Sequence, residues 1–139
     1  MTRHRFGLLD TNTVIVLSRL TDAHALPEEP RISTITLAEL SVGPLVATND
    51  LERAHRQAHV QQAEADFEPL PFDAAAARAF GRVAASLRRS GRKTTARTYD
   101  AMIAAVAIAN ALPLFTCNPS DYVGIDELTV VAVPQPMDG

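Results

Sequence analysis

Three acidic residues, Asp10, Glu39 and Asp100, lie where their carboxylates could act together. Asp10 directly follows an apolar segment typical of a buried strand, and Asp100 opens an apolar segment typical of a helix. In an open parallel sheet, the carboxyl ends of the strands and the N-termini of the following helices share one edge, where ligands bind. Carboxylates gathered there repel one another. A divalent cation removes this conflict, and oxygen donors with few histidines favour Mg²⁺ or Mn²⁺ over zinc.

Each acid also has a structural explanation. Asp10 is placed to cap the helix that follows it. Glu39 completes a Thr-x-x-Glu capping box that begins at Thr36. Asp100 lies two residues after Thr98, the expected cap, where the helix dipole favours a negative charge. The prediction of a site therefore rests on the convergence of the three acids and not on any one of them.

The remaining reactive residues indicate no rival chemistry. His55 and His59 have the i, i+4 spacing that can bind zinc, but no further ligand motif accompanies them. Cys117 is the only cysteine, which excludes a disulfide framework, and no histidine lies near it in the sequence. The chain has no glycine-rich phosphate-binding loop. Phosphatases of the haloacid-dehalogenase type need a second acid two residues after the first, and Asn12 stands there.

Strand-like and helix-like segments alternate along the chain, which predicts an α/β fold with a parallel sheet covered by helices on both faces. No repeat or linker interrupts this order, so we expect one domain over residues 1–139. The helix after Thr98 is apolar nearly all round and should be central. We expect strands at 5–9, 31–33, 67–70, 114–116 and 128–133. We expect helices at 11–20, 49–64, 74–90 and 99–110. A further helix is expected to run through Leu37 and Leu40 and to be interrupted at Gly43–Pro44.

Composition and charge narrow the class of protein. The chain has 139 residues, 47% of them apolar, and a net charge of −3. No apolar run approaches the roughly 18 residues of a membrane span, and the first strand leaves no room for a signal peptide, so we expect a cytoplasmic protein with no membrane partner. Residues 74–99 contain no acid, which is compatible with a polyanionic substrate or with a solvated helix face. The basic residues in that stretch are Arg78, Arg82, Arg88, Arg89, Arg92, Lys93 and Arg97.

Four motifs in order along the chain resemble those of PIN-domain ribonucleases, and more closely the VapC-type toxins of type II toxin–antitoxin systems. The motifs lie at 8–12, 35–40, 99–105 and 116–122. The resemblance covers essentially the whole chain. It implies a PIN-like fold with a short central parallel sheet, and a Mg²⁺-dependent endoribonuclease in which Mn²⁺ can substitute.

The resemblance also implies roles for the acids. Asp10 and Asp100 are expected to bind the principal metal directly, and Glu39 through water or by orienting the attacking hydroxide. Asn118 stands where other PIN proteins carry a fourth acid, so Asn118 or Asp121 is expected to complete the metal shell or the catalytic set, or to position a second ion. The alternative is a site that uses three carboxylates only. In the same motif, Cys117 replaces the usual arginine and Tyr122 the usual phenylalanine. Thr11 and Thr116 match hydroxyls that lie near the metal.

A substrate and partners follow from the same resemblance. The substrate is expected to be single-stranded or looped RNA, with flanking phosphates held by Arg88, Arg89, Arg92 and Lys93. A VapB-type antitoxin is expected to place an apolar segment in a groove between the helix of Leu37 and Leu40 and helix 49–64, unless these apolar residues are simply core. A homodimer is also expected. Two alternatives stay open: a housekeeping RNA-processing PIN nuclease, and a degenerate, non-catalytic PIN binding module.

Overall fold

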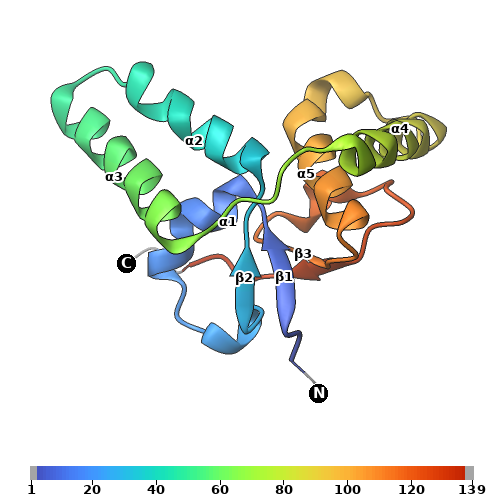
Figure 1. Cartoon of the computed structure of the whole chain (residues 1–139), viewed down its shortest axis with the longest axis horizontal. Helices are drawn as coiled ribbons and strands as arrows, with labels where there is room; N and C mark the ends of the chain where they lie inside the picture. The colour runs from blue at the N-terminus through green and yellow to red at the C-terminus, as the bar shows by residue number, and fades with distance from the viewer. Residues whose placement is uncertain (1–2, 137–139) are drawn as a thin grey trace.

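A four-stranded parallel sheet lies at the centre of the computed structural model, which describes residues 3–136 (Figure 1). The strand order is β2-β1-β3-β4, so β1 and β3 are the inner strands. Their register pairs Leu8 with Leu114 and Leu9 with Phe115. The residues that follow β1 and β3 therefore meet at one edge of the sheet. The strands are β1 (Phe6–Leu9), β2 (Glu29–Arg31), β3 (Leu114–Thr116) and β4 (Val130–Ala132).

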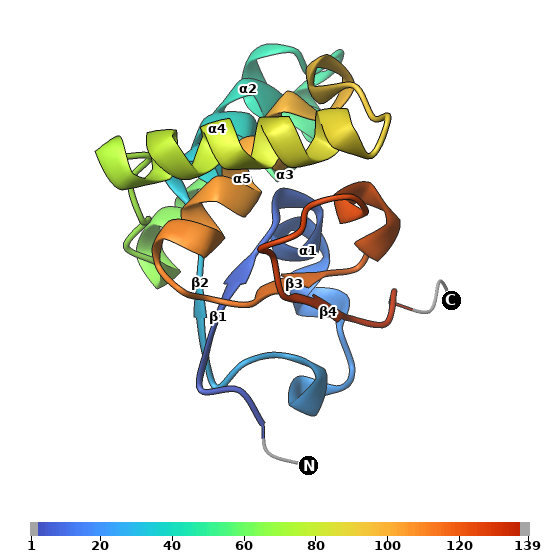
Figure 2. The same cartoon turned by 90° about the vertical axis from the view of Figure 1, so that its right-hand side faces the viewer.

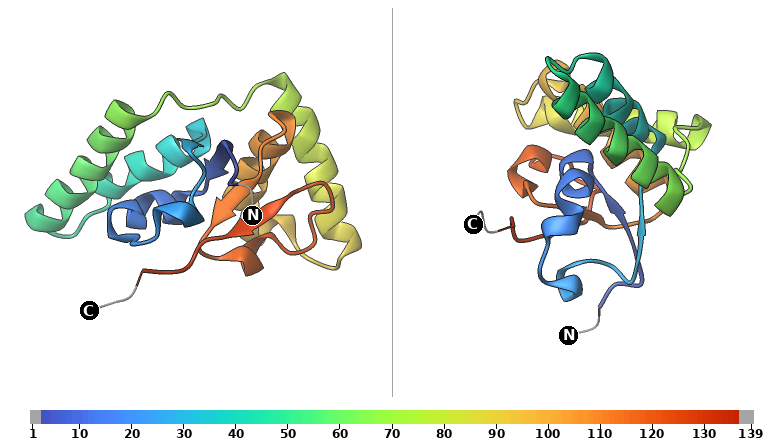
Figure 3. Two further views of the ribbon diagram at one scale, coloured as in Figure 1. Left: turned by 90° about the horizontal axis from the view of Figure 1, so that it is seen from below. Right: turned by 90° about the vertical axis from the view of Figure 1, so that its left-hand side faces the viewer.

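Helices cover both faces of the sheet, as the sequence predicts. Leu8 and Leu114 pack into a core with α4 and α5, whereas Leu9 and Phe115 pack on the opposite face with side chains of α1. Figure 2 shows α4 and α5 together above the strands, and Figure 3 shows α3 running along α2. The helices are α1 (Thr11–Val16), α2 (Thr34–Leu45), α3 (Asp50–Asp66), α4 (Ala74–Arg89) and α5 (Thr98–Ala109).

The α5 helix is central, as its uniform apolarity predicts. Its buried residues include Ile103 and Val106 together with four alanines, and small side chains let α4 pack closely against it. On the other side of the strands, α2 and α3 form a hairpin around a separate core of Ile32, Leu40 and Val60 (Figure 1). Within residues 3–136, none of the helices has the length and apolarity needed to cross a membrane.

Two of the predicted strands are wrong in extent. The strand expected at 31–33 lies two residues earlier and includes Pro30. Proline is tolerated there because β2 is an edge strand. The strand expected at 67–70 is absent from the described structure, where only Leu70 forms a single bridge, to Ser33. Pro69 and Pro71, on either side of Leu70, have no backbone N–H to donate and therefore favour an extended connection over a paired strand.

Three helix boundaries also differ from the prediction. Helix α2 continues through Gly43–Pro44 to Leu45, with Pro44 in its last turn. The first helix ends at Val16 and continues as a 3₁₀ turn, Leu17–Arg19. Thr98 is the first residue of α5 and not its cap, because a 3₁₀ turn, Thr94–Arg97, runs directly into the helix.

Gly7 is required by the close approach of β1 to Phe115. A Cβ atom at Gly7 would overlap the Phe115 ring and lie 3.1 Å from Cγ of Pro27. We expect Gly7→Ala to lower the free energy of unfolding by about 2 kcal/mol, since overpacking a close-packed core strains it. The measurement is urea denaturation.

Gly81→Ala is the matched control. A Cβ atom at Gly81, on the exposed side of α4, meets nothing within 4 Å. Alanine should raise the free energy of unfolding there by about 1 kcal/mol, because glycine is a poor helix former. Equal stabilities for the two variants would contradict the packing described for β1.

Candidate active site

Asp10 is a buried carboxylate at the carboxyl end of β1, with 4% of its surface exposed. It caps α1, and its Oδ1 atom accepts hydrogen bonds from the Thr13 backbone N–H (3.2 Å) and from the Thr13 hydroxyl (2.5 Å). Its Oδ2 atom accepts from the hydroxyls of Thr116 (2.7 Å) and Tyr122 (3.0 Å). Four donors therefore offset the cost of burying this carboxylate. Asp10 is both a helix cap and a fixed point of the candidate site.

Tyr122 links Asp10 to the acid that opens α5. Its ring is 2% exposed, and its hydroxyl oxygen lies 3.4 Å from Oδ1 of Asp100 in addition to its contact with Asp10. Burial raises the pKa of the Tyr122 phenol, and the nearby charges of Asp10 and Asp100 raise it further. The phenol therefore stays protonated and serves as a hydrogen-bond donor between the two acids.

Glu39 reaches the same region from α2. Thr11 donates its hydroxyl to Glu39 Oε1 (2.6 Å) and lies 3.0 Å from the hydroxyl oxygen of Thr36. The capping box predicted for Glu39 is wrong, because α2 is capped by Ser33, whose hydroxyl accepts from the Thr36 backbone N–H (3.2 Å). Burial raises the pKa of Glu39, the Thr11 hydrogen bond opposes this, and the charge of Asp10 adds to it. Glu39 is thus free of the structural role that the sequence offered.

The carboxylates share one electrostatic environment at Asp100, in the first turn of α5. Its pKa is raised to about 6, chiefly by burial. The charges of Asp121, Asp10 and Glu39 raise this pKa further, while Arg97 lowers it. The sheet edge therefore brings the predicted acids close enough to disfavour each other's charge, as expected for unpaired carboxylates.

Comparisons with known proteins agree with this arrangement. A model of the PIN domain matches residues 8–122, which span all of these acids. The chain belongs to the PIN-domain family. It is 38% identical to "Ribonuclease VapC5" of Mycobacterium tuberculosis over 129 residues, which cover 91% of this chain and 93% of that protein.

Two solved PIN-domain structures resemble the fold. The VapBC-5 member of the VapBC family of toxin–antitoxin systems from M. tuberculosis matches with a TM-score of 0.77 and 35% identity, over 93% of this chain and 99% of that chain. DNA-bound VapBC from Salmonella typhimurium matches with a TM-score of 0.70 and 28% identity, over 91% and 96% of the two chains. The chain is therefore a PIN-domain protein of the VapC ribonuclease group.

The two candidates for the fourth position of the PIN-domain site have different surroundings. Asp121 Oδ1 lies 2.5 Å from Nη1 of Arg97, and the charge of Asp121 is the largest carboxylate contribution to the raised pKa of Asp100. The Asn118 side chain instead accepts a hydrogen bond from Nε2 of Gln135 (3.0 Å). The charge of Asp121 therefore acts directly on the acids of the site, whereas the Asn118 side chain is bound by Gln135.

The side-chain oxygen atoms at this edge of the PIN domain are of the kind that bind a hard divalent cation. These oxygen donors are carboxylates and hydroxyls, which Mg²⁺ and Mn²⁺ prefer, and the mutual repulsion of the carboxylates is the kind that a cation relieves. Among residues 3–136, however, no three Asp, Glu, His or Cys side chains already stand in a ready metal-binding cluster.

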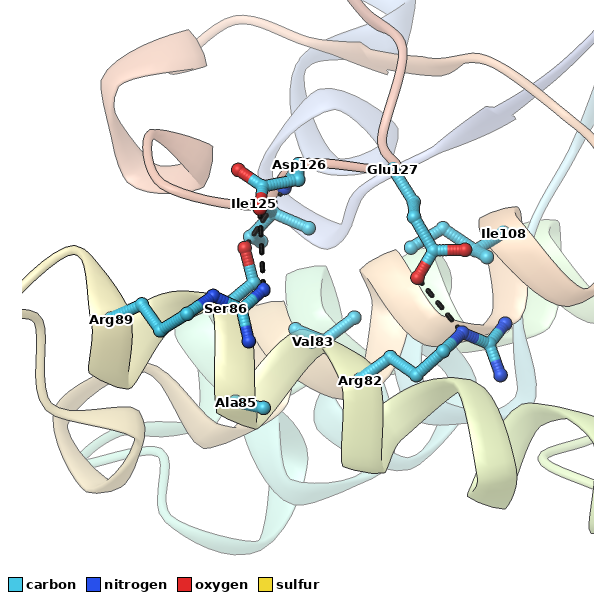
Figure 4. Close-up of a pocket in the computed structure, with 9 residues that line it drawn as sticks. All are labelled: Arg82, Val83, Ala85, Ser86, Arg89, Ile108, Ile125, Asp126 and Glu127. Atoms are coloured by element: carbon cyan, nitrogen blue, oxygen red, sulfur yellow. Dashed lines mark hydrogen bonds and ion pairs between the residues drawn. The ribbon is translucent and has the colours of Figure 1, made fainter.

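The predicted basic residues separate into two groups. Arg88, Arg92 and Lys93 border a shallow hollow with Thr95, and Thr95 also borders the hollow that contains Glu39 and Asp100. Basic and acidic surfaces are therefore continuous there. Arg89 lies apart, because it pairs with Asp126 (3.3 Å) in the pocket between α4 and the 125–127 loop (Figure 4).

Sequence reasoning missed Thr13, and it named Tyr122 and Arg97 without their contacts to the acids. Thr13 supplies two hydrogen bonds to Asp10, and its hydroxyl accepts another from the Cys117 backbone N–H (3.1 Å). A threonine three residues after an aspartate cap was the only local signal for it. Tyr122 and Arg97 reach the acids through tertiary contacts, although the i, i+3 spacing of Arg97 and Asp100 is visible in the sequence.

The raised pKa of Asp100 predicts a pH-dependent effect in chelator-treated protein. The folded state binds this proton more strongly than the unfolded state, so the Asp100 carboxylate destabilises the fold above about pH 6, and this cost fades as the pH falls. Asp100→Asn should therefore stabilise the protein by about 1 kcal/mol more at about pH 7.5 than at about pH 5, after allowance for solvent screening. Urea denaturation at the two pH values measures it. An equal effect at both values would contradict the described environment.

Proposed function

We propose that this chain is the RNA-cleaving toxin of a VapBC-type toxin–antitoxin pair, and that it hydrolyses RNA phosphodiester bonds with Mg²⁺ held by its acids. The observation that carries the proposal is the gathering of Asp10, Glu39 and Asp100 at one sheet edge of a PIN domain related to VapC ribonucleases. The VapBC complexes among its structural relatives favour the toxin over a housekeeping nuclease.

Asp10 and Asp100 are the proposed direct ligands of Mg²⁺, with Asp121 as the fourth acid and Asn118 as the alternative. When bound, the cation would supply charge neutralisation at the scissile phosphate and a lower pKa for a water molecule. The chain's own contribution is to fix the ligands. The Thr13 hydroxyl donates to Oδ1 of Asp10, and the Thr116 hydroxyl donates to Oδ2.

Glu39 is the proposed base. Its raised pKa suits a group that takes a proton from the attacking water, and Thr11 holds one carboxylate oxygen in place for that transfer. Arg88, Arg92 and Lys93 are proposed to hold phosphates that flank the cleaved bond, along the surface that Thr95 joins to the acids. The preference for RNA over DNA rests on the VapC relatives.

Loss of either proposed metal ligand should abolish RNA cleavage. We expect Asp10→Asn and Asp100→Asn each to lower kcat/KM by at least about 100-fold, because a neutral amide no longer binds the cation or balances its charge. EDTA should have the same effect on the unmodified protein, and added Mg²⁺ or Mn²⁺ should reverse it. The measurement is cleavage of labelled single-stranded RNA by each folded variant.

Asp66→Asn serves as the control, because Asp66 is an exposed carboxylate at the end of α3, away from the acids. It should cleave RNA as the unmodified protein does. Full activity of Asp10→Asn or Asp100→Asn, or cleavage that survives EDTA, would reject the proposed site. Mg²⁺-loaded protein that cleaves no RNA would favour the binding-module alternative.

The partner is proposed to be a VapB-type antitoxin that inserts an apolar segment between α1 and the α2–α3 hairpin. A groove of about 450 Å³ lies there. Its walls agree in part with the sequence prediction, because Leu40 and one face of α3 line it, while α1 supplies Val14 and Ile15. Leu37 instead packs beside the core of the hairpin. The groove suits an amphipathic helix, which can lay its apolar face against these walls.

Charge in this groove should prevent antitoxin binding. We expect Ala58→Glu, which places a carboxylate in the groove wall, to weaken capture of the protein encoded next to this gene by at least about tenfold. Ala77→Glu, at an exposed alanine of α4, is the matched control and should bind normally. Pull-down and titration calorimetry measure the difference. Equal binding by both variants would exclude the groove as the antitoxin site.

Three further expectations stay proposals: that residues 1–139 act as one PIN-like domain, that two copies form a homodimer, and that the protein works in the cytoplasm. The homodimer is the commonest symmetric assembly of proteins of this size.

A further inference from the structure

Arg97 is a cation already paired with the acids of the site. Its Nη1 atom lies 2.5 Å from Oδ1 of Asp121 and 3.7 Å from Oδ2 of Asp100. These carboxylates come from the 3₁₀ turn Pro119–Tyr122 and from the first turn of α5. One guanidinium therefore joins two elements that the sequence separates by about twenty residues.

Within residues 3–136, the positive charge of Arg97 acts on Asp100 against three negative charges. The carboxylates of Asp121, Asp10 and Glu39 disfavour the charged form of Asp100, and the charge of Arg97 favours it. A second cation that binds between these acids must therefore share or replace the interaction that Arg97 makes.

We propose that Arg97 is the resident counter-cation of the acidic site and that a divalent cation must displace its guanidinium from Asp100 in order to bind. This inference rests on the cation site proposed above. The contact with Asp100 is the longer of the two, so it is the one that gives way, while Asp121 keeps the guanidinium at the edge of the site. Arg97 thereby sets the concentration of divalent cation at which the site fills.

The surroundings of Arg97 allow this movement. Its side chain is 44% exposed and lines an open hollow together with Glu39, Thr98, Tyr99 and Asp100. The guanidinium therefore reaches water without displacing a packed side chain. Exposed ion pairs of this kind are weak in proteins, which suits a contact that has to be exchanged.

The test is the affinity of metal-free protein for Mn²⁺, measured by titration calorimetry and by the electron paramagnetic resonance of free Mn²⁺. We expect Arg97→Gln to bind Mn²⁺ about fivefold more tightly than the unmodified protein, because the cation no longer competes with the guanidinium. Arg97→Lys keeps the charge and should stay within about twofold of the unmodified protein.

Arg82→Gln is the matched control. Arg82 is an exposed arginine of α4 that is paired with one carboxylate, Glu127 (2.8 Å), and lies in the pocket between α4 and the 125–127 loop (Figure 4). Its replacement changes the net charge equally and should leave the Mn²⁺ affinity unchanged. A general charge effect would instead tighten Mn²⁺ binding in both glutamine variants, and that result would overturn the proposal.

A second readout follows the side chain itself. In protein labelled with ¹⁵N-arginine, titration with Mg²⁺ should shift the Nε–Hε resonance of Arg97 with the same midpoint as binding, while that of Arg82 stays in place. An Arg97 resonance that does not move at saturating Mg²⁺ would reject displacement.

The two proposals fail in different ways. Unmodified protein that does not bind Mn²⁺, or Asp10→Asn that binds it equally well, would reject the cation site itself, and with it the role of Arg97. Binding that requires Asp10 but has the same affinity in Arg97→Gln would reject the counter-cation role alone.

Discussion

The burial of the Asp10 carboxylate is the constraint on which the arrangement of the site depends. A buried charge without partners is very costly, so the fold has to deliver donors to both carboxylate oxygens. Those donors come from the first turn of α1, from the end of β3 and from the 3₁₀ turn that ends at Tyr122. The parallel pairing of β1 with β3 brings these elements together. The hydrogen bonds of one aspartate thus tie α1, β3 and the Pro119–Tyr122 turn together at the sheet edge.

The same sheet edge also brings several carboxylates together, and the neighbouring positive charge only partly neutralises them. Burial and neighbouring carboxylates raise the pKa values of Glu39 and Asp100, which is unfavourable for the stability of the charged protein. Two donors moderate this cost: the Tyr122 hydroxyl between Asp10 and Asp100, and the Arg97 guanidinium between Asp100 and Asp121. Such strained electrostatics are characteristic of functional sites, where a ligand or reaction provides the compensation.

Two helices serve both the acidic site and the apolar groove. In α2, Glu39 faces the acids while Leu40 lines the groove, and in α1 Thr11 holds Glu39 while Ile15 lines the groove. Adjacent residues of a helix point in different directions, so one short helix can present a polar side chain to one surface and an apolar side chain to another. A partner seated in the groove would therefore contact the same helices that position the proposed base.

Periodicity and the residues at strand ends are local properties, so the sequence predicted the α/β class, the order of most elements and the closeness of Asp10, Glu39 and Asp100. It also identified Asp10 as a helix cap. The contacts of Glu39 depend on tertiary structure, since the cap of α2 is Ser33 and the Thr11 contact joins separate helices. Tertiary structure likewise placed Pro30 within an edge strand. The contacts of Thr116 and Tyr122 with Asp10 span more than one hundred residues, and no local pattern encodes contacts that depend on which strands pair.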